Sequence, residues 1–195
     1  MSSKTTTSAH KLAQLHADRT QRLILEAAVS MLEEAPTAPL TMREVARRAQ
    51  ISERTIFRYF ATREALLDAV AVEVVRGMAQ PPHPRSLEEL LAAPRALYSA
   101  LDANPTLVKV ALDSEVYDRI RTSQANQRWI AIRKVIDHAA PRVSERRRRF
   151  AAANIRLFLS ATGWRYYRFY FQFSLEDTIE CAEMAIRQSL KAIGK

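Results

Sequence analysis

The sequence predicts an all-α protein, and three of its features lead to that expectation. The 195-residue chain contains only three glycines, so conformationally free backbone is scarce. Alanine, leucine, arginine and glutamate, which favour helices, are abundant. A hydroxyl-bearing or acidic residue followed three positions later by Glu, Gln or Asp recurs along the chain, which is typical of helix N-termini. No segment has the alternating pattern of a β-strand.

The N-terminal part is expected to form four helices after a disordered polar tail over residues 1–17. Each helix begins after a side chain that can cap it: Asp18, Thr41, Ser52 and Thr62. The expected ranges are about 19–34, 41–48, 52–60 and 62–78. Pro36 and Pro39 stop the first helix, because proline has no N–H and clashes with the preceding turn.

A cluster of prolines marks the best candidate for a linker, at about 80–85. Ser86 with Glu89 opens the next helix, and Ser174 with Asp177 opens the last. The helices expected after the linker span about 86–101, 105–112, 115–139, 144–173 and 174–193. The sequence therefore divides into a small N-terminal unit and a larger helical bundle.

The charge balance favours an anionic partner. The formal net charge is +9, which suits nucleic acid or an acidic membrane face. Cys181 is the single cysteine, so no disulfide can form within the chain. No apolar run is long enough to span a bilayer, and the polar N-terminus lacks the apolar segment of a signal peptide. A cytoplasmic protein without a membrane partner is expected.

Motifs of catalysis are missing from the sequence. Phosphate-binding loops and nucleophile elbows need closely spaced glycines, and none occur. The four histidines are scattered, and no His/Asp/Glu set has metal-ligand spacing on one helix. We therefore expect no enzyme, no catalytic residue, no metal site and no cofactor.

Residues 41–59 have the spacing of a helix-turn-helix unit. One set of side chains is apolar and can hold the two helices together: Val45, Ala46, Ala49, Ile51, Ile56 and Phe60. A second set can face outward with groups suited to DNA: Ser52, Glu53, Arg54, Thr55, Arg58 and Tyr59. Arginine can hold guanine O6 and N7 together, and hydroxyl groups suit phosphates. Short amphipathic helices with surface arginines also occur in ordinary bundles, so periodicity alone leaves both interpretations open.

Residues 40–67, LTMREVARRAQISERTIFRYFATREALL, resemble the N-terminal signature of the TetR family. That signature combines a T-x-R-E-I/V-A opening, a recognition helix of the form S-x-x-T-hydrophobic-aromatic-x-Y/H-F, and an x-K/R-E-x-L-L start of the fourth helix. The one departure is Gln50, where the family usually has glycine in the turn. If Gln50 is left-handed, it costs on the order of 1 kcal/mol relative to glycine.

The resemblance implies a set of DNA-contacting residues at the start of the second helix, along the third and at the start of the fourth. They are Thr41, Arg43, Ser52, Glu53, Arg54, Thr55, Phe57, Arg58, Tyr59 and Arg63. It also implies a DNA-binding domain over residues 18–62, and a ligand-binding and dimerisation domain over residues 63–195. The last two long helices, about 144–173 and 174–193, would form a four-helix dimer interface.

The function that the resemblance implies is a ligand-responsive repressor. A homodimer would bind a palindromic double-stranded operator and be released by a small, mainly apolar effector. Candidates to line the effector chamber are Tyr98, Asn126, Trp129, Asn154, Phe158, Trp164 and Tyr167, although aromatic residues at helical spacing are also typical of an ordinary core.

Three alternatives stay open at the level of sequence. The regulator could activate rather than repress. The basic charge could instead serve a helical interaction module or a bundle that binds a membrane surface. The run of four arginines at 146–149 could be a solvated helix face, or it could meet an anionic ligand or DNA beside the site.

Overall fold

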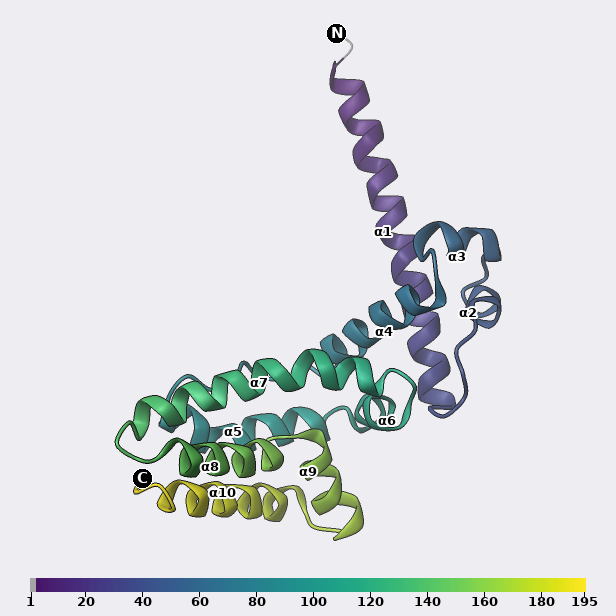
Figure 1. Ribbon diagram of the computed structural model, residues 1–195. Helices are drawn as coiled ribbons and strands as arrows, with labels where there is room; N and C mark the ends of the chain where they lie inside the picture. Colours follow the sequence, from purple (N-terminus) through teal and green to yellow (C-terminus); the bar gives the residue numbers. More distant parts are fainter. Residues whose placement is uncertain (1–2) are drawn as a thin grey trace.

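The computed structural model describes residues 3–195, and describes their side chains from 14 to 122 and from 126 to 195. All regular structure within these residues is helical, which confirms the all-α expectation (Figure 1). The elements are α1 Ser3–Glu34, α2 Met42–Arg48, α3 Glu53–Tyr59, α4 Arg63–Gly77, α5 Leu87–Asp102, α6 Pro105–Asp113, α7 Tyr117–Ala139, α8 Glu145–Phe158, α9 Ala161–Arg165, the π-helix η1 Tyr166–Tyr170, and α10 Leu175–Lys191.

The expected hydroxyl caps begin five of these helices. In each, the serine or threonine oxygen accepts the N–H of the third residue after it. The distances are 3.2 Å for Thr41, 3.1 Å for Ser52, 3.1 Å for Thr62, 3.1 Å for Ser86 and 3.1 Å for Ser174. The starts of α2, α3, α4, α5 and α10 therefore follow from local sequence.

The first helix is longer than the sequence analysis predicts. Helix α1 begins at Ser3, so the expected disordered tail is wrong for residues 3–17, while residues 1 and 2 lie outside the described residues. Asp18 lies inside the helix, where its Oδ1 accepts from Gln14 Nε2 at 3.0 Å, and it does not cap a helix start. The polar segment contains no glycine or proline, and extending an existing helix needs no new nucleus.

The prediction of a single long helix at 144–173 is wrong, because the helix α8 ends at Phe158. Ser160 donates from Oγ to the Leu157 carbonyl at 2.6 Å and accepts from the Gly163 N–H at 3.0 Å, so it starts α9. A serine hydroxyl that forms hydrogen bonds with nearby backbone groups competes with the regular hydrogen bonds of a helix and favours a helix end or start. A π-helix, η1, then follows α9.

The helices form two units joined by α4. Helices α1, α2 and α3 pack together at one end, whereas α5, α7, α8 and α10 lie side by side as an elongated bundle (Figure 1). Helix α4 contacts α1 on one side and α6 and α7 on the other. Among the described residues, no helix combines the length and apolar character that crossing a bilayer requires.

Candidate nucleic-acid interface

Helices α2 and α3 form a helix-turn-helix around a small apolar contact. Val45, Ala46, Ile56 and Phe60 are buried, while Ala49 and Ile51 are partly buried against them. The turn is a Schellman motif, in which Gln50 N–H donates to the Arg47 carbonyl at 3.2 Å and Ile51 N–H donates to the Ala46 carbonyl at 3.0 Å. Gln50 has φ 56°, which is the left-handed conformation considered from sequence.

The opposite face of the unit presents most of the side chains expected to contact DNA. Seven of them are exposed: Thr41, Arg43, Ser52, Glu53, Arg54, Phe57 and Arg58. Thr55 and Tyr59 are partly buried, and the Thr55 hydroxyl lies 2.8 Å from that of Ser52. The structure therefore brings nine of the ten candidates to the start of α2 and along α3.

Arginines of this region differ in whether a carboxylate neutralises them. Arg47 is paired with Glu44 at 2.9 Å within α2, and Arg48 is paired with Glu34 of α1. The charge of each is therefore neutralised within the chain. Arg43 and Arg54 have no hydrogen-bond or ion-pair partner among the described residues. Their guanidinium groups are free to meet phosphate or the edge of a guanine.

Tyr59 links α3 to α1. The side chain of Arg58 lies over its ring, with 5.2 Å between the guanidinium carbon and the ring centroid. The hydrogen bond with Thr20 is the main cause of a lowered pKa of the Tyr59 phenol; burial opposes it, and the hydrogen bond and charge of Arg58 add smaller effects in the lowering direction. Contacts with Thr20 of α1 and Arg58 of α3 therefore position the phenol between the two helices.

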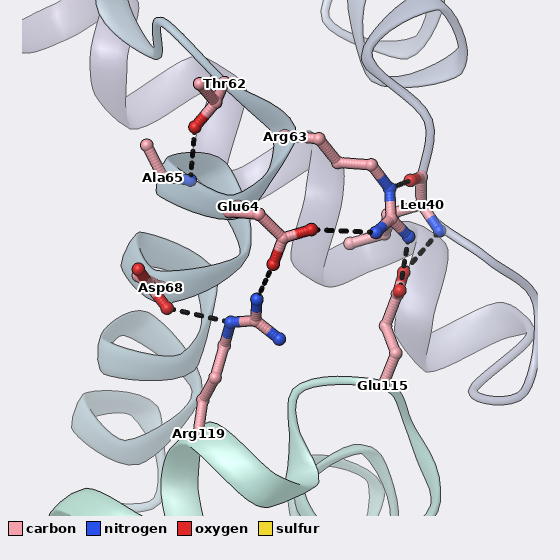
Figure 2. A network of polar contacts seen from close by, with 8 residues as sticks. All are labelled: Leu40, Thr62, Arg63, Glu64, Ala65, Asp68, Glu115 and Arg119. Carbon is pink, nitrogen blue, oxygen red and sulfur yellow. Dashed lines mark hydrogen bonds and ion pairs between the residues drawn. The ribbon is translucent and has the colours of Figure 1, made fainter.

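Arg63, the tenth candidate, is partly exposed and is paired within the chain. Its Nε donates to the Leu40 carbonyl at 2.7 Å, and its terminal nitrogens pair with the Glu115 carboxylate and, at 3.6 Å, with the Glu64 carboxylate (Figure 2). Glu115 also accepts the Leu40 N–H at 2.6 Å. A carboxylate 52 residues away in sequence, in the turn between α6 and α7, therefore holds this arginine.

A second arginine strengthens the same junction. Arg119 of α7 donates to Asp68 at 2.8 Å and pairs with Glu64, both on α4 (Figure 2). Together with Arg63 and Glu115, these contacts fix the start of α4 to the start of α7. Sequence analysis missed this network, because neither Glu115 nor Arg119 lies in a recognisable motif.

The bundle contains a cavity of about 650 Å³ between the segment directly after α4 and helices α6, α7, α8 and α9. Its wall is mainly apolar and includes Met78, Leu112, Ile120 and Trp129. Two of the seven sequence candidates for ligand contact, Asn126 and Trp129, lie in this wall.

The other five candidates do not line this cavity. Tyr98 and Trp164 are buried core residues, and the Tyr98 hydroxyl donates to the Phe158 carbonyl. Asn154 is exposed on α8, while Phe158 and Tyr167 are partly buried against the core. The break in the helix at Leu159 changes the direction of the later aromatic side chains, which a continuous helix would have carried along one face.

The arginine run at the start of α8 is divided between contacts within the chain and solvent. Arg147 donates to the Ala192 carbonyl at 3.0 Å, at the negative end of the α10 dipole. Arg148 lies 3.4 Å from the Asp137 carboxylate, and Arg146 lies over the Phe150 ring at 5.4 Å. Arg149 is exposed without a partner among the described residues. Arg147 and Arg148 therefore contact other helices of the bundle, whereas Arg146 and Arg149 lie at its surface.

A helix-turn-helix with an exposed polar face on α3, joined by α4 to a helical bundle, is an arrangement typical of DNA-binding proteins. Residues 24–70 match the family described as bacterial regulatory proteins, tetR family. This segment of the chain, which includes α2 and α3, is therefore similar to the DNA-binding domain of that family. Members of this family are DNA-binding proteins and not enzymes.

Solved structures with the same fold extend over nearly the whole chain. A TetR-like transcriptional regulator from Rhodococcus sp. RHA1 has a TM-score of 0.61 and 16% sequence identity, covering 90% of this chain and 97% of its own. NalD of Pseudomonas aeruginosa, the secondary repressor of the MexAB-OprM multidrug efflux pump, has a TM-score of 0.62 and 12% identity, covering 89% and 96%. Among curated proteins, none matches the sequence significantly.

Proposed function

We propose that this chain is a ligand-responsive repressor that binds a palindromic operator as a homodimer. The observation that carries the proposal is the exposed face of α3 and the start of α2, where Arg43 and Arg54 lack neutralising partners among the described residues. Arginines left unpaired on a recognition helix are available for bases and phosphates. Such a protein acts on operator DNA in the cytoplasm.

Dimerisation is supported by an apolar face on α8 and α10, two helices that pack against each other. Phe150 and Leu157 of α8 are 49% and 58% exposed, and Met184 of α10 is 56% exposed. Large apolar side chains exposed on two packed helices are typical of interaction surfaces. A second copy packed on this face would form the four-helix interface.

Charge on the same face fits a two-fold arrangement. The outer side of α8 begins with Arg146 and Arg149, and α10 begins with Asp177 and Glu180. The two helices run antiparallel (Figure 1), so their charged starts lie at opposite ends of the face. A two-fold axis across the helices would set the acidic start of one subunit against the basic start of the other.

The cavity of about 650 Å³ is proposed as the effector site. It lies against Met78, just after α4, and against Ile120 at the start of α7. Both helices take part in the junction with the DNA-binding unit shown in Figure 2. A ligand that binds one arrangement of α4 and α7 better than another would change the spacing of the two reading heads in a dimer.

The decisive test is selection of bound DNA from a random double-stranded library by the native protein. We expect enrichment of an inverted repeat whose half-sites lie about one helical turn apart. Arg54→Ala should weaken binding to the selected DNA about tenfold or more, as expected for loss of about 1–3 kcal/mol per specific contact.

Arg47→Ala is the matched control, since Arg47 is exposed but paired with Glu44. It should retain sequence preference. The proposal would be contradicted if the native protein bound DNA without sequence preference and in a salt-sensitive way, and if Arg54→Ala bound DNA equally well. Binding to anionic vesicles in place of DNA would favour the membrane-surface alternative.

A further inference from the structure

Arg128 of α7 is buried in the bundle without a counter-ion. Its residue surface is only 8% exposed. The guanidinium donates to the Leu159 carbonyl at 3.1 Å and to the Gln80 side-chain carbonyl, both of which are neutral acceptors. No carboxylate of the described residues forms an ion pair with it.

A second arginine from α8 shares the site. Arg156 is partly buried, and its one recorded hydrogen bond is a long one of 3.4 Å to the same Leu159 carbonyl. Arg156 likewise has no ion pair within the described part of the chain. Both arginines line the cavity of about 650 Å³.

Other partly buried arginines of the bundle are paired with carboxylates. Arg133 is paired with Asp137 at 3.1 Å, and Arg168 is paired with Asp102 at 2.6 Å. Arg165 is paired with Asp113. Arg128 is more deeply buried than any of these, yet it is the one whose neighbours carry the same charge.

The local electrostatics are unfavourable without an anion. Burial, and to a smaller extent the charge of Arg156, lower the pKa of Arg128 to about 10, and burial lowers the pKa of Arg156 as well. Burial and the charge of Arg128 also lower the pKa of His83. Arg128 is still a cation at neutral pH, and a buried cation destabilises the fold unless an anion compensates it.

We propose that the cavity binds an amphipathic anion, whose head group is held by Arg128 and Arg156 and whose apolar body lies against Trp129, Ile120 and Leu112. This inference rests on the proposed effector site and assigns the chemical class of the effector. Carboxylate, sulfonate and phosphate groups all suit the paired guanidinium forks. The volume is in the range of small-molecule sites, and apolar walls with a few polar groups are typical of them.

The position of this site also provides a route by which ligand binding could affect the DNA-binding unit. Gln80, which accepts from Arg128, lies in the segment directly after α4. An anion that competes with Gln80 for the Arg128 guanidinium would release this segment from α7. The head group therefore acts at the point where α4 ends.

A matched pair of fluorescent compounds tests the proposal. Anilinonaphthalene sulfonate (ANS) is an amphipathic anion, and N-phenylnaphthylamine has the same aromatic system without the sulfonate. Titration of the full-length native protein should give a Kd for ANS at least tenfold lower than that for the neutral compound. Arg156→Met should reduce this preference at least tenfold, because methionine keeps the apolar volume and removes the charge.

Arg142→Met is the control, since Arg142 is exposed and forms no hydrogen bond or ion pair with the side chains that the structure describes. It should leave the preference unchanged. Arg156→Met is chosen over a change at Arg128 because Arg156 makes fewer hydrogen bonds, and thermal unfolding of this variant should show an unchanged or higher Tm. Equal Kd values for the two compounds in the native protein, or an unchanged preference in Arg156→Met, would overturn the proposal.

The same preparation separates this inference from the proposed function. DNA selection by the native protein tests the repressor, whereas the ANS preference tests the anion site alone. Displacement of bound ANS by naphthoate or by decanoate then distinguishes an aromatic from an acyl carboxylate.

Discussion

Gln50 carries the one departure from the usual residue pattern of the turn between α2 and α3. Its φ of 56° is in the left-handed region, which disfavours residues with a Cβ. The Schellman hydrogen bonds to Arg47 and Ala46 hold it there and satisfy carbonyls at the end of α2. The fold tolerates glutamine at a position where glycine would have no Cβ penalty.

Gln50→Gly should therefore stabilise the protein by about 1 kcal/mol. In a chain of this length, that gain corresponds to a rise in Tm of about 2–4 °C. DNA binding should be preserved, because Gln50 is exposed and lies in the turn before the reading face. Thermal unfolding monitored by circular dichroism measures the change. Gln50→Ala is the control and should give no such rise, since alanine keeps the Cβ.

At the scale of elements, the contact between α4 and α7 joins the DNA-binding unit to the bundle. Glu115 binds Arg63 and the Leu40 N–H, and Arg119 binds Glu64 and Asp68 (Figure 2). The resemblance implies that Arg63 contacts a DNA phosphate, whereas in this structure its guanidinium pairs with the Glu115 carboxylate. Glu115 and a DNA phosphate would then compete for the same guanidinium.

Glu115→Gln should strengthen DNA binding, because Arg63 then keeps only the longer ion pair with Glu64, at 3.6 Å, and is more available to phosphate. The slope of log K against log salt should steepen by about one for each subunit. Titrations of fluorescent operator DNA over a range of salt concentrations measure both quantities. Asp118→Asn is the control, since Asp118 is exposed and its side chain has no partner in the described part of the chain. A salt slope that stays the same in Glu115→Gln would argue against the competition.

At the scale of the whole molecule, α8 and α10 carry exposed apolar side chains. Phe150, Leu157 and Met184 lie exposed there, although both helices also bury an apolar side in the core of the chain. A helix that is apolar on two sides needs a second partner. Oligomeric assembly would therefore complete the burial that the isolated chain begins.

Leu157→Glu combined with Met184→Glu should convert the dimer into a monomer, because each subunit would place two buried carboxylates in the interface. Sedimentation velocity measures the change in mass, and operator affinity should fall with it. Ile130→Glu is the matched control, since Ile130 is 57% exposed on α7, a different helix. A double variant that remains dimeric would place the interface elsewhere.

The sequence by itself determined the helical class, the capped starts of α2, α3, α4, α5 and α10, and the exposed polar face of α3. These features depend on neighbours within a few residues, such as Ser52 with Thr55, so local pattern is enough to find them. The left-handed conformation of Gln50 was only a conditional expectation, which rested on the glycine usual at that position in the family.

Only the tertiary structure decided the features that join distant segments. The contact of Arg63 with Glu115, 52 residues away in sequence, lies outside local pattern. The extension of α1 to Ser3 and the break at Ser160 are local features that the sequence analysis did not predict. The buried pair of Arg128 and Arg156 was missed because a sequence shows that an arginine is charged but not which groups surround it. Whether a charge is neutralised depends on contacts between α7, α8 and the segment after α4, and those exist only once the bundle has packed.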